Sequence, residues 1–116
     1  MELNFFDSSE APKPRDQVTI EALRATAYPD GWRVRVGVDV TPFQERPSLE
    51  IRLHTAAGRE VAALSIIETM HRAMEFTIHI RGVNNPTGQY TLSADLYFGD
   101  ERDKIQAHAE TPFEIA

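Results

Sequence analysis

From Gln17 onward, apolar and polar residues alternate along most of the chain. The clearest alternation covers residues 32–41. Its apolar positions are Trp32, Val34, Val36, Val38 and Val40. Because successive side chains of a β-strand point to opposite faces, this segment is predicted to be a strand with one buried and one solvated face. Trp32 shares the phase of the valines, so we expect it in the core.

Other segments repeat this alternation and are separated by turn-forming residues. They span residues 18–27, 49–54, 61–67, 74–81, 90–98 and 105–115. Tyr28-Pro29-Asp30-Gly31 suits a type I turn, and Gly58 suits the left-handed conformation of a hairpin. The last segment places Ile105 in the core phase. The pattern predicts an all-β protein in which about seven antiparallel strands form a two-sheet sandwich.

Two places break the simple alternation. The apolar phase slips between Ala22 and Leu23, which predicts a β-bulge there. Residues 59–74 carry apolar residues at nearly helical spacing, but the β-branched residues of this segment and the position of Gly58 favour a strand. We expect a strand over about 61–67, followed by a loop or a helical turn over about 68–73, and a helix remains the alternative.

The first 16 residues differ from the rest of the chain. They contain two prolines and little to bury, so they are predicted to form an extended N-terminal arm, with the sandwich domain at 17–116. Phe5 and Phe6 are unusual in such a segment. Either they belong to an edge strand that folds back on the domain, or they form an apolar hook for another subunit.

Composition places the chain among soluble globular proteins, with 41% apolar and 26% charged residues in 116. No apolar run reaches the ~20 residues that a membrane-spanning helix needs. The N-terminus lacks the basic and apolar regions of a secretory signal, so we expect a cytoplasmic location or a domain excised from a larger exported protein. The net charge of −6 disfavours nucleic acid as a partner.

No pattern of catalytic or ligand-binding residues stands out. The chain has no cysteine, which excludes thiol catalysis and cysteine-bound metals. The four histidines, His54, His71, His79 and His108, have no metal-binding spacing among them. No nucleophile elbow or phosphate-binding glycine loop is present. We therefore expect no enzyme activity, no cofactor and no metal.

One short motif resembles a known family. Gly88-Gln89-Tyr90-Thr91-Leu92 is similar to the tyrosine corner of immunoglobulin-like sandwiches, in which a tyrosine hydroxyl bonds back to the chain. Leu92 stands where many of these domains have a cysteine, and Trp32 lies on the second long strand rather than the third. The resemblance implies a bacterial immunoglobulin-like or fibronectin type III-like domain, and it implies no chemistry.

These observations predict a non-enzymatic module that mediates protein interaction or assembly, with a protein partner or self-association. The alternative is a module that binds a small ligand or carbohydrate. In either case exposed aromatic side chains would form the contact surface, since Tyr28 and Phe43 lie in connections and Tyr97 is expected to face outward. The candidate residues are Phe5, Phe6, Tyr28, Phe43 and Tyr97.

Overall fold

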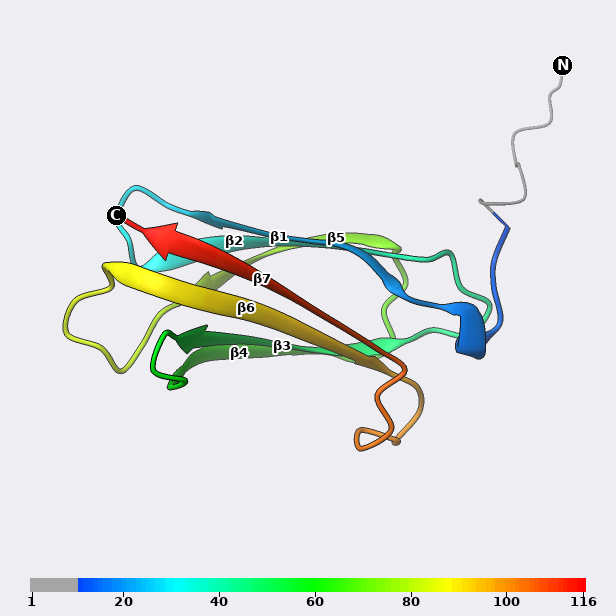
Figure 1. The fold of residues 1–116 in the computed structure, drawn as a ribbon. Helices are drawn as coiled ribbons and strands as arrows, with labels where there is room; N and C mark the ends of the chain where they lie inside the picture. The colour runs from blue at the N-terminus through cyan, green and yellow to red at the C-terminus, as the bar shows by residue number, and fades with distance from the viewer. Residues whose placement is uncertain (1–10) are drawn as a thin grey trace, which may run out of the picture.

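The computed structural model describes residues 11–116, which form seven β-strands and one short 3-10 helix (Figure 1). Phe5 and Phe6 lie outside the described residues, so the two interpretations of their role stay predictions. The elements are η1 (Arg15–Gln17), β1 (Ile20–Ala27), β2 (Arg33–Val40), β3 (Ser48–Thr55), β4 (Glu60–Ile66), β5 (Ala73–His79), β6 (Gly88–Tyr97) and β7 (Ala107–Ile115).

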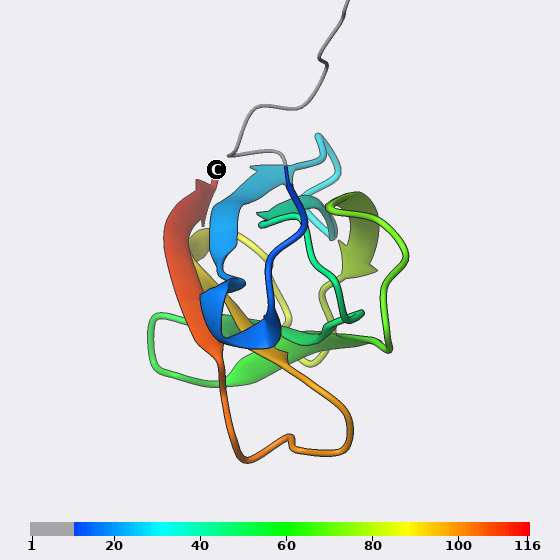
Figure 2. The same cartoon turned by 90° about the vertical axis from the view of Figure 1, so that its right-hand side faces the viewer.

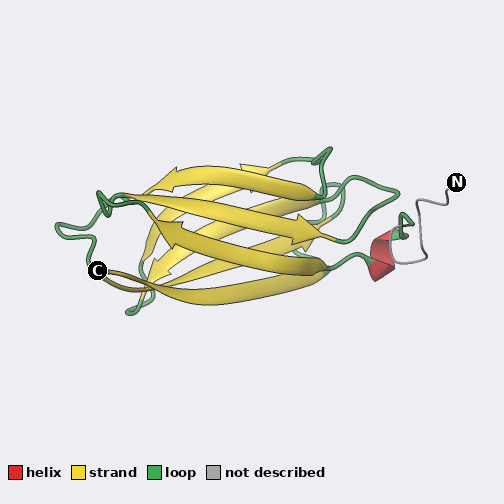
Figure 3. Cartoon of the chain, turned by 90° about the horizontal axis from the view of Figure 1, so that it is seen from above, coloured by secondary structure: helices red, strands yellow, loops and turns green. Residues whose placement is uncertain are grey.

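The strands form two antiparallel sheets that pack face to face (Figures 1 and 3). The three-stranded sheet has the order β1-β2-β5, and the four-stranded sheet has the order β4-β3-β6-β7. Figure 2 shows β7 lying against β1, which closes one side of the sandwich. On the other side β4 and β5 make far fewer contacts. The predicted seven-stranded, two-sheet sandwich is confirmed.

The core lies between the sheets and consists of the apolar positions of the alternating segments. Val34, Val36, Val38 and Val40 on β2 are completely buried. They face fully buried residues of the other sheet, which are Leu49, Ile51, Leu53, Leu92, Ala94 and Leu96. Burial of each large aliphatic side chain contributes about 1.5–3 kcal/mol. The alternation is therefore the main source of the stability of the fold.

Two residues expected in the core are exposed instead. Trp32 keeps 38% of its surface accessible and Ile105 keeps 44%. Both lie just outside a strand, since β2 begins at Arg33 and β7 begins at Ala107. The alternation of side chains holds only within extended backbone, and Gly31, with a φ of +74°, turns the chain immediately before Trp32. The prediction of core positions for Trp32 and Ile105 was wrong.

The strand registers show the structure of the two segments in which the alternation is irregular. The pairing of β1 with β2 shifts between Ile20 and Ala22, close to the predicted bulge at Ala22 and Leu23. Residues 60–66 form strand β4, and a loop follows before β5 begins at Ala73. A second shift between Leu53 and His54 lets Val61 turn inward, where it is buried. The strand interpretation of this segment is confirmed.

The tyrosine-corner motif makes the hydrogen bond that the resemblance implied. The hydroxyl of Tyr90, at the start of β6, donates to the carbonyl of Pro86 over 2.6 Å. Burial raises the pKa of Tyr90, so the hydroxyl keeps its proton and acts as a donor. Gly31 packs against the same proline, which links the β1–β2 turn to the start of β6.

The segment before β1 is attached to one end of the sandwich. The Lys13 N–H donates to the Pro42 carbonyl over 2.8 Å, and the Gln44 N–H donates to the Lys13 carbonyl over 3.0 Å. Arg15 forms ion pairs with Glu45 and Glu101. Within residues 11–116, no helix has the length and apolar character to cross a bilayer. The boundary between arm and domain at residue 16 stays a prediction.

Candidate functional site

The loop between β4 and β5, residues 67–72, presents two large apolar side chains to solvent. Ile67 is 57% exposed and Met70 is 69% exposed. The loop backbone, in contrast, is hydrogen-bonded to the sandwich. The Thr69 N–H donates to the Pro47 carbonyl over 2.9 Å, and the Val40 N–H donates to the Arg72 carbonyl over 2.8 Å.

A second set of contacts fixes the middle of this β4–β5 loop. The Glu68 N–H donates to the hydroxyl of Ser48 over 2.9 Å. The hydroxyl of Thr69, a buried residue, accepts a hydrogen bond from the His71 N–H over 3.2 Å. Glu68 has a φ of +48°, a conformation that non-glycine residues seldom adopt and that persists only when the surroundings enforce it. These contacts therefore fix the loop backbone in a conformation that leaves the side chains of Ile67 and Met70 exposed.

Grooves lie on both sides of the β4–β5 loop. One has a volume of about 340 Å³ and is lined by Ile66, Thr69, His71, Ala73, Met74, Glu75 and Phe76. The other has a volume of about 360 Å³ and is lined by Glu45, Arg46, Glu68 and Gly99. In the part of the chain that is described, β4 pairs only with β3 and β5 only with β2, so each has a second edge that no strand covers. The loop joins these two open edges.

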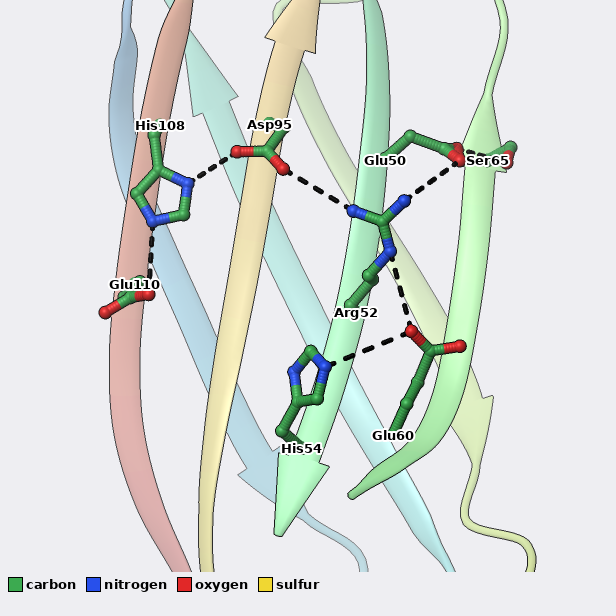
Figure 4. A network of polar contacts seen from close by, with 8 residues as sticks. All are labelled: Glu50, Arg52, His54, Glu60, Ser65, Asp95, His108 and Glu110. Atoms are coloured by element: carbon green, nitrogen blue, oxygen red, sulfur yellow. Dashed lines mark hydrogen bonds and ion pairs between the residues drawn. The ribbon is translucent and has the colours of Figure 1, made fainter. Parts of the chain in front are cut away.

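The outer face of the four-stranded sheet carries a network of charged side chains with Arg52 at its centre (Figure 4). The guanidinium nitrogens of Arg52 lie 3.5 Å from a carboxylate oxygen of Glu60, 3.5 Å from Asp95 and 3.9 Å from Glu50. Glu50 also accepts a hydrogen bond from the Ser65 hydroxyl. Arg52 thus neutralises part of a surface in which carboxylates predominate.

His108 extends this network onto β7. Its Nδ1 lies 2.5 Å from an oxygen of Asp95, and its Nε2 lies 3.2 Å from an oxygen of Glu110 (Figure 4). Hydrogen bonding to Asp95, with a smaller contribution from Glu110, raises the pKa of His108. Among residues 11–116, no group of three histidine or acidic side chains is placed to hold a metal ion. The network offers a flat, mainly acidic surface.

On the outer face of the three-stranded sheet, two arginines lie beside the ring of Tyr28. The Tyr28 hydroxyl lies 3.0 Å from the hydroxyl of Thr77, so the side chain reaches across β2 to β5. The guanidinium carbon of Arg33 lies 4.4 Å from the centre of the Tyr28 ring, and that of Arg35 lies 5.7 Å from it. Hydrogen bonding with Thr77 and then Arg35 lowers the pKa of Tyr28.

The aromatic residues proposed from sequence do not form one surface. Tyr28 is partly exposed, whereas Phe43 packs against the core beside the bridge to Lys13. Tyr97 is only 1% exposed, so the expectation that it faces solvent was wrong. Tyr97 is outside the core cluster and the guanidinium of Arg102 lies over its ring at 5.9 Å, so the loop after β6 covers it.

Sequence reasoning missed Ile67 and Met70 as surface residues. Ile67 ends the strand predicted over about 61–67, and both residues belong to the apolar stripe of the helical alternative, a pattern that normally marks a buried face. The signal that could have identified them is the end of the alternation after Ile66, since apolar residues beyond the end of a strand need not be buried. The anchoring of the loop by Ser48 and Pro47 has no local sequence signal.

The chain was compared with known protein families, curated proteins and solved structures. No family model matches it, and no curated protein matches it. Similar solved structures include a glycosyl hydrolase family 2 member from Bacteroides cellulosilyticus DSM 14838, at 14% identity and a TM-score of 0.59. They also include a β-glucuronidase from Bifidobacterium dentium, at 18% identity and 0.58, and a β-galactosidase described as putative from Bacteroides fragilis, at 16% and 0.55.

These likenesses cover most of this chain but only a small part of the other chains. The matches include 84%, 84% and 86% of this chain, and they span 15%, 18% and 16% of the larger chains. At such low identity the likeness establishes the fold and not the activity. The chain is therefore similar in fold to a segment of larger glycoside hydrolases.

Proposed function

We propose that this chain is a non-enzymatic β-sandwich module that mediates protein interaction or assembly through the β4–β5 loop. The observation that carries the proposal is the exposure of Ile67 and Met70 on a loop whose backbone is held by Pro47, Ser48 and Val40. A loop that is already ordered loses little conformational entropy when it binds.

The energetics of the β4–β5 loop fit a protein contact. Complete burial of a side chain such as Ile or Met contributes about 1.5–3 kcal/mol, and a few well-placed side chains dominate most interfaces. Charged side chains lie close to the loop, since Glu68 follows Ile67 in the sequence and lines one groove together with Glu45 and Arg46. An apolar centre with a polar rim is the usual composition of an interface.

The finer description of the fold belongs to the same proposal. We infer an immunoglobulin-like sandwich, for which the Tyr90–Pro86 hydrogen bond and the strand orders are the support. In this fold the strand after the third can join the sheet of the third, as β4 joins β3 here. The fibronectin type III-like variant fits the same arrangement. Because the similarity covers only a segment of each larger hydrolase, it supports an accessory role in a larger assembly. The expected cytoplasmic location stays a prediction.

Site-specific photo-crosslinking in the source cell tests the interaction. A photoreactive amino acid at position 70 should give a defined adduct with one protein or with a second copy of the chain, identified by mass spectrometry. The same label at Gln89, an exposed residue on the outer face of β6, is the control. Adducts that are equal from both positions, or absent from position 70, would contradict the proposed surface.

Carbohydrate binding is the second candidate function. Two observations favour it: Tyr28 and the exposed Trp32 flank the same turn, and the similar structures named above are glycoside hydrolases. Trp32 is the only tryptophan of the chain, so its fluorescence reports on this turn alone. A panel of sugars that leaves the emission of Trp32 unchanged at millimolar concentration would remove this candidate.

A further inference from the structure

Three side chains form a row across the outer face of the three-stranded sheet. Thr26 on β1 pairs in register with Arg35 on β2, and Arg35 pairs with Thr77 on β5. All three side chains are exposed. Because neighbouring strands lie about 4.8 Å apart, the row places one threonine on each side of Arg35, and the Thr77 hydroxyl lies 3.0 Å from that of Tyr28.

Arg35 differs from the neighbouring arginines, Arg24 and Arg33, because it forms no ion pair with any carboxylate in the described part of the chain. Arg24 pairs with Asp39 and Arg33 pairs with Asp30. Within residues 11–116, no carboxylate oxygen lies within 4.0 Å of the Arg35 guanidinium, whose carbon lies 5.7 Å from the centre of the Tyr28 ring. The nearest negative charge that acts on Arg35 is Glu75, at a longer distance. An exposed arginine without a close carboxylate is available to bind an external anion.

Two shallow grooves meet at Arg35 and Tyr28. The first, of about 230 Å³, is lined by Thr26, Ala27, Tyr28, Pro29 and Arg35. The second, of about 160 Å³, is lined by Tyr28, Arg35, Glu75, Phe76 and Thr77. A small ligand seated over Arg35 would therefore contact a hydroxyl, an aromatic ring and an apolar proline face together.

We propose that this row binds the carboxylate of an acidic sugar. The planar guanidinium of Arg35 matches a carboxylate with two parallel hydrogen bonds. The hydroxyls of Thr26 and Thr77 can each donate to or accept from sugar hydroxyls, and Tyr28 and Pro29 supply surface for the carbon face of the ring. Glu75 lines the same groove as Arg35 and repels further negative charge there, so the ligand carries a single carboxylate.

This inference rests on the second candidate function, carbohydrate binding. It adds the ligand class, an acidic sugar, and the residue that recognises the carboxylate, Arg35. It can be tested by NMR titration of the chain labelled with ¹⁵N, using methyl glucuronide, methyl glucoside and acetate as probes. Methyl glucuronide should shift the amide signals of residues 26, 35 and 77. Arg35→Gln should weaken its binding at least about tenfold, as expected when a charge-assisted hydrogen-bond pair is lost.

Arg81→Gln is the matched control, because it removes an equal charge from an exposed position that follows β5 and lines neither of the two grooves. This variant should bind methyl glucuronide as the unchanged chain does.

If methyl glucoside binds equally well and Arg35→Gln has no effect, the role of the carboxylate is overturned while carbohydrate binding stands. If acetate binds as tightly as methyl glucuronide, the sugar is not recognised and the inference fails. If no probe binds, both this inference and the second candidate function fail, and the protein-interaction proposal is unaffected.

Discussion

Single residues at one end of the sandwich show how local chemistry secures the fold. Tyr90 begins β6, and its hydroxyl satisfies the carbonyl of Pro86 in the connection before the strand. Pro86 in turn packs against Gly31, whose φ of +74° requires a residue without a β-carbon. Tyr90 also stacks on Phe113 of β7, at 5.6 Å between ring centres. Two connections and two strands therefore depend on these few contacts.

Tyr90→Phe should lower the free energy of unfolding by about 1–1.5 kcal/mol, because the partly buried Pro86 carbonyl loses its donor while the ring packing remains. Chemical denaturation measures the change. Tyr28→Phe is the control, since it removes a hydroxyl whose partner, Thr77, is exposed to water, and it should change stability by less than about 0.5 kcal/mol. Equal losses of unfolding free energy in the two variants would contradict a stabilising role of the Tyr90–Pro86 hydrogen bond.

Gly31→Ala should destabilise the protein more than Gly58→Ala does. Both glycines have a positive φ, which costs an alanine about 1–2 kcal/mol. At Gly31 the new β-carbon would also lie 3.2 Å from the Cγ of Pro86, whereas at Gly58 it would meet nothing within 4 Å. Thermal and denaturant unfolding of the two variants checks the order. A larger loss for Gly58→Ala would contradict the close approach at Gly31.

At the scale of elements, the large apolar side chains that are exposed within residues 11–116 all lie outside the strands; they are Trp32, Ile67, Met70 and Ile105. Leu92, within β6, is completely buried, while Ile105, two residues before β7, is 44% exposed. In the same way, Val34 within β2 is completely buried, while Trp32, just before β2, is exposed. A position outside a strand permits exposure but does not require it, since Val18, Ile80 and Phe98 also lie outside the strands and are buried in the core.

Substitution by alanine separates these two classes of aliphatic residue. Leu92→Ala should cost about 2–5 kcal/mol, because it leaves a cavity in a closely packed interior. Ile105→Ala should cost less than about 1 kcal/mol, since the side chain is already in contact with water. Urea unfolding of both variants measures the difference. Similar losses would mean that Ile105 belongs to the core, as the alternation alone had predicted.

At the scale of the whole molecule, the negative charge is unevenly distributed. The outer face of the four-stranded sheet combines Glu50, Glu60, Asp95 and Glu110 with a single arginine, Arg52 (Figure 4). His108 lies between Asp95 and Glu110 and adds positive charge when protonated. The outer face of the three-stranded sheet instead balances Arg24 and Arg33 with nearby aspartates and leaves Arg35 without a close carboxylate. The two faces therefore suit different partners.

The His108 contacts predict a pH dependence of stability. Its pKa in the folded protein is raised by Asp95 and Glu110, so the contribution is fully present below the unfolded value of 6.5 and is lost as the pH rises through the folded pKa. His108→Gln should therefore reduce stability more at about pH 6 than at about pH 9. The side chain is half exposed, so the difference should be about 0.5 kcal/mol or less.

Denaturation at both pH values, with and without the substitution, measures this difference. Asp95→Asn should reduce it as well, because Asp95 is the main partner of His108. A destabilisation by His108→Gln that is the same at both pH values would contradict the charge interaction.

The success of sequence reasoning at the candidate surfaces varied with how local each feature is. Tyr28 was identified because it follows a strand and belongs to a turn, and both are local properties. Tyr97 was misjudged because the loop after β6 folds over it, which alternation within β6 does not reveal. Arg35 was not among the candidate residues, since its row with Thr26 and Thr77 depends on the register of three strands.

The alternating pattern by itself determined the seven strands, the two-layer class and the buried valines of β2, because a strand side chain faces inward or outward according to its position in an extended backbone. Only the tertiary structure decided which apolar residues stay outside. Ile67 and Met70 face solvent because Val40 on β2 and Pro47 and Ser48 at the start of β3 hold their loop in place. Contacts between segments distant in sequence set strand registers and loop anchoring, and no local pattern encodes them.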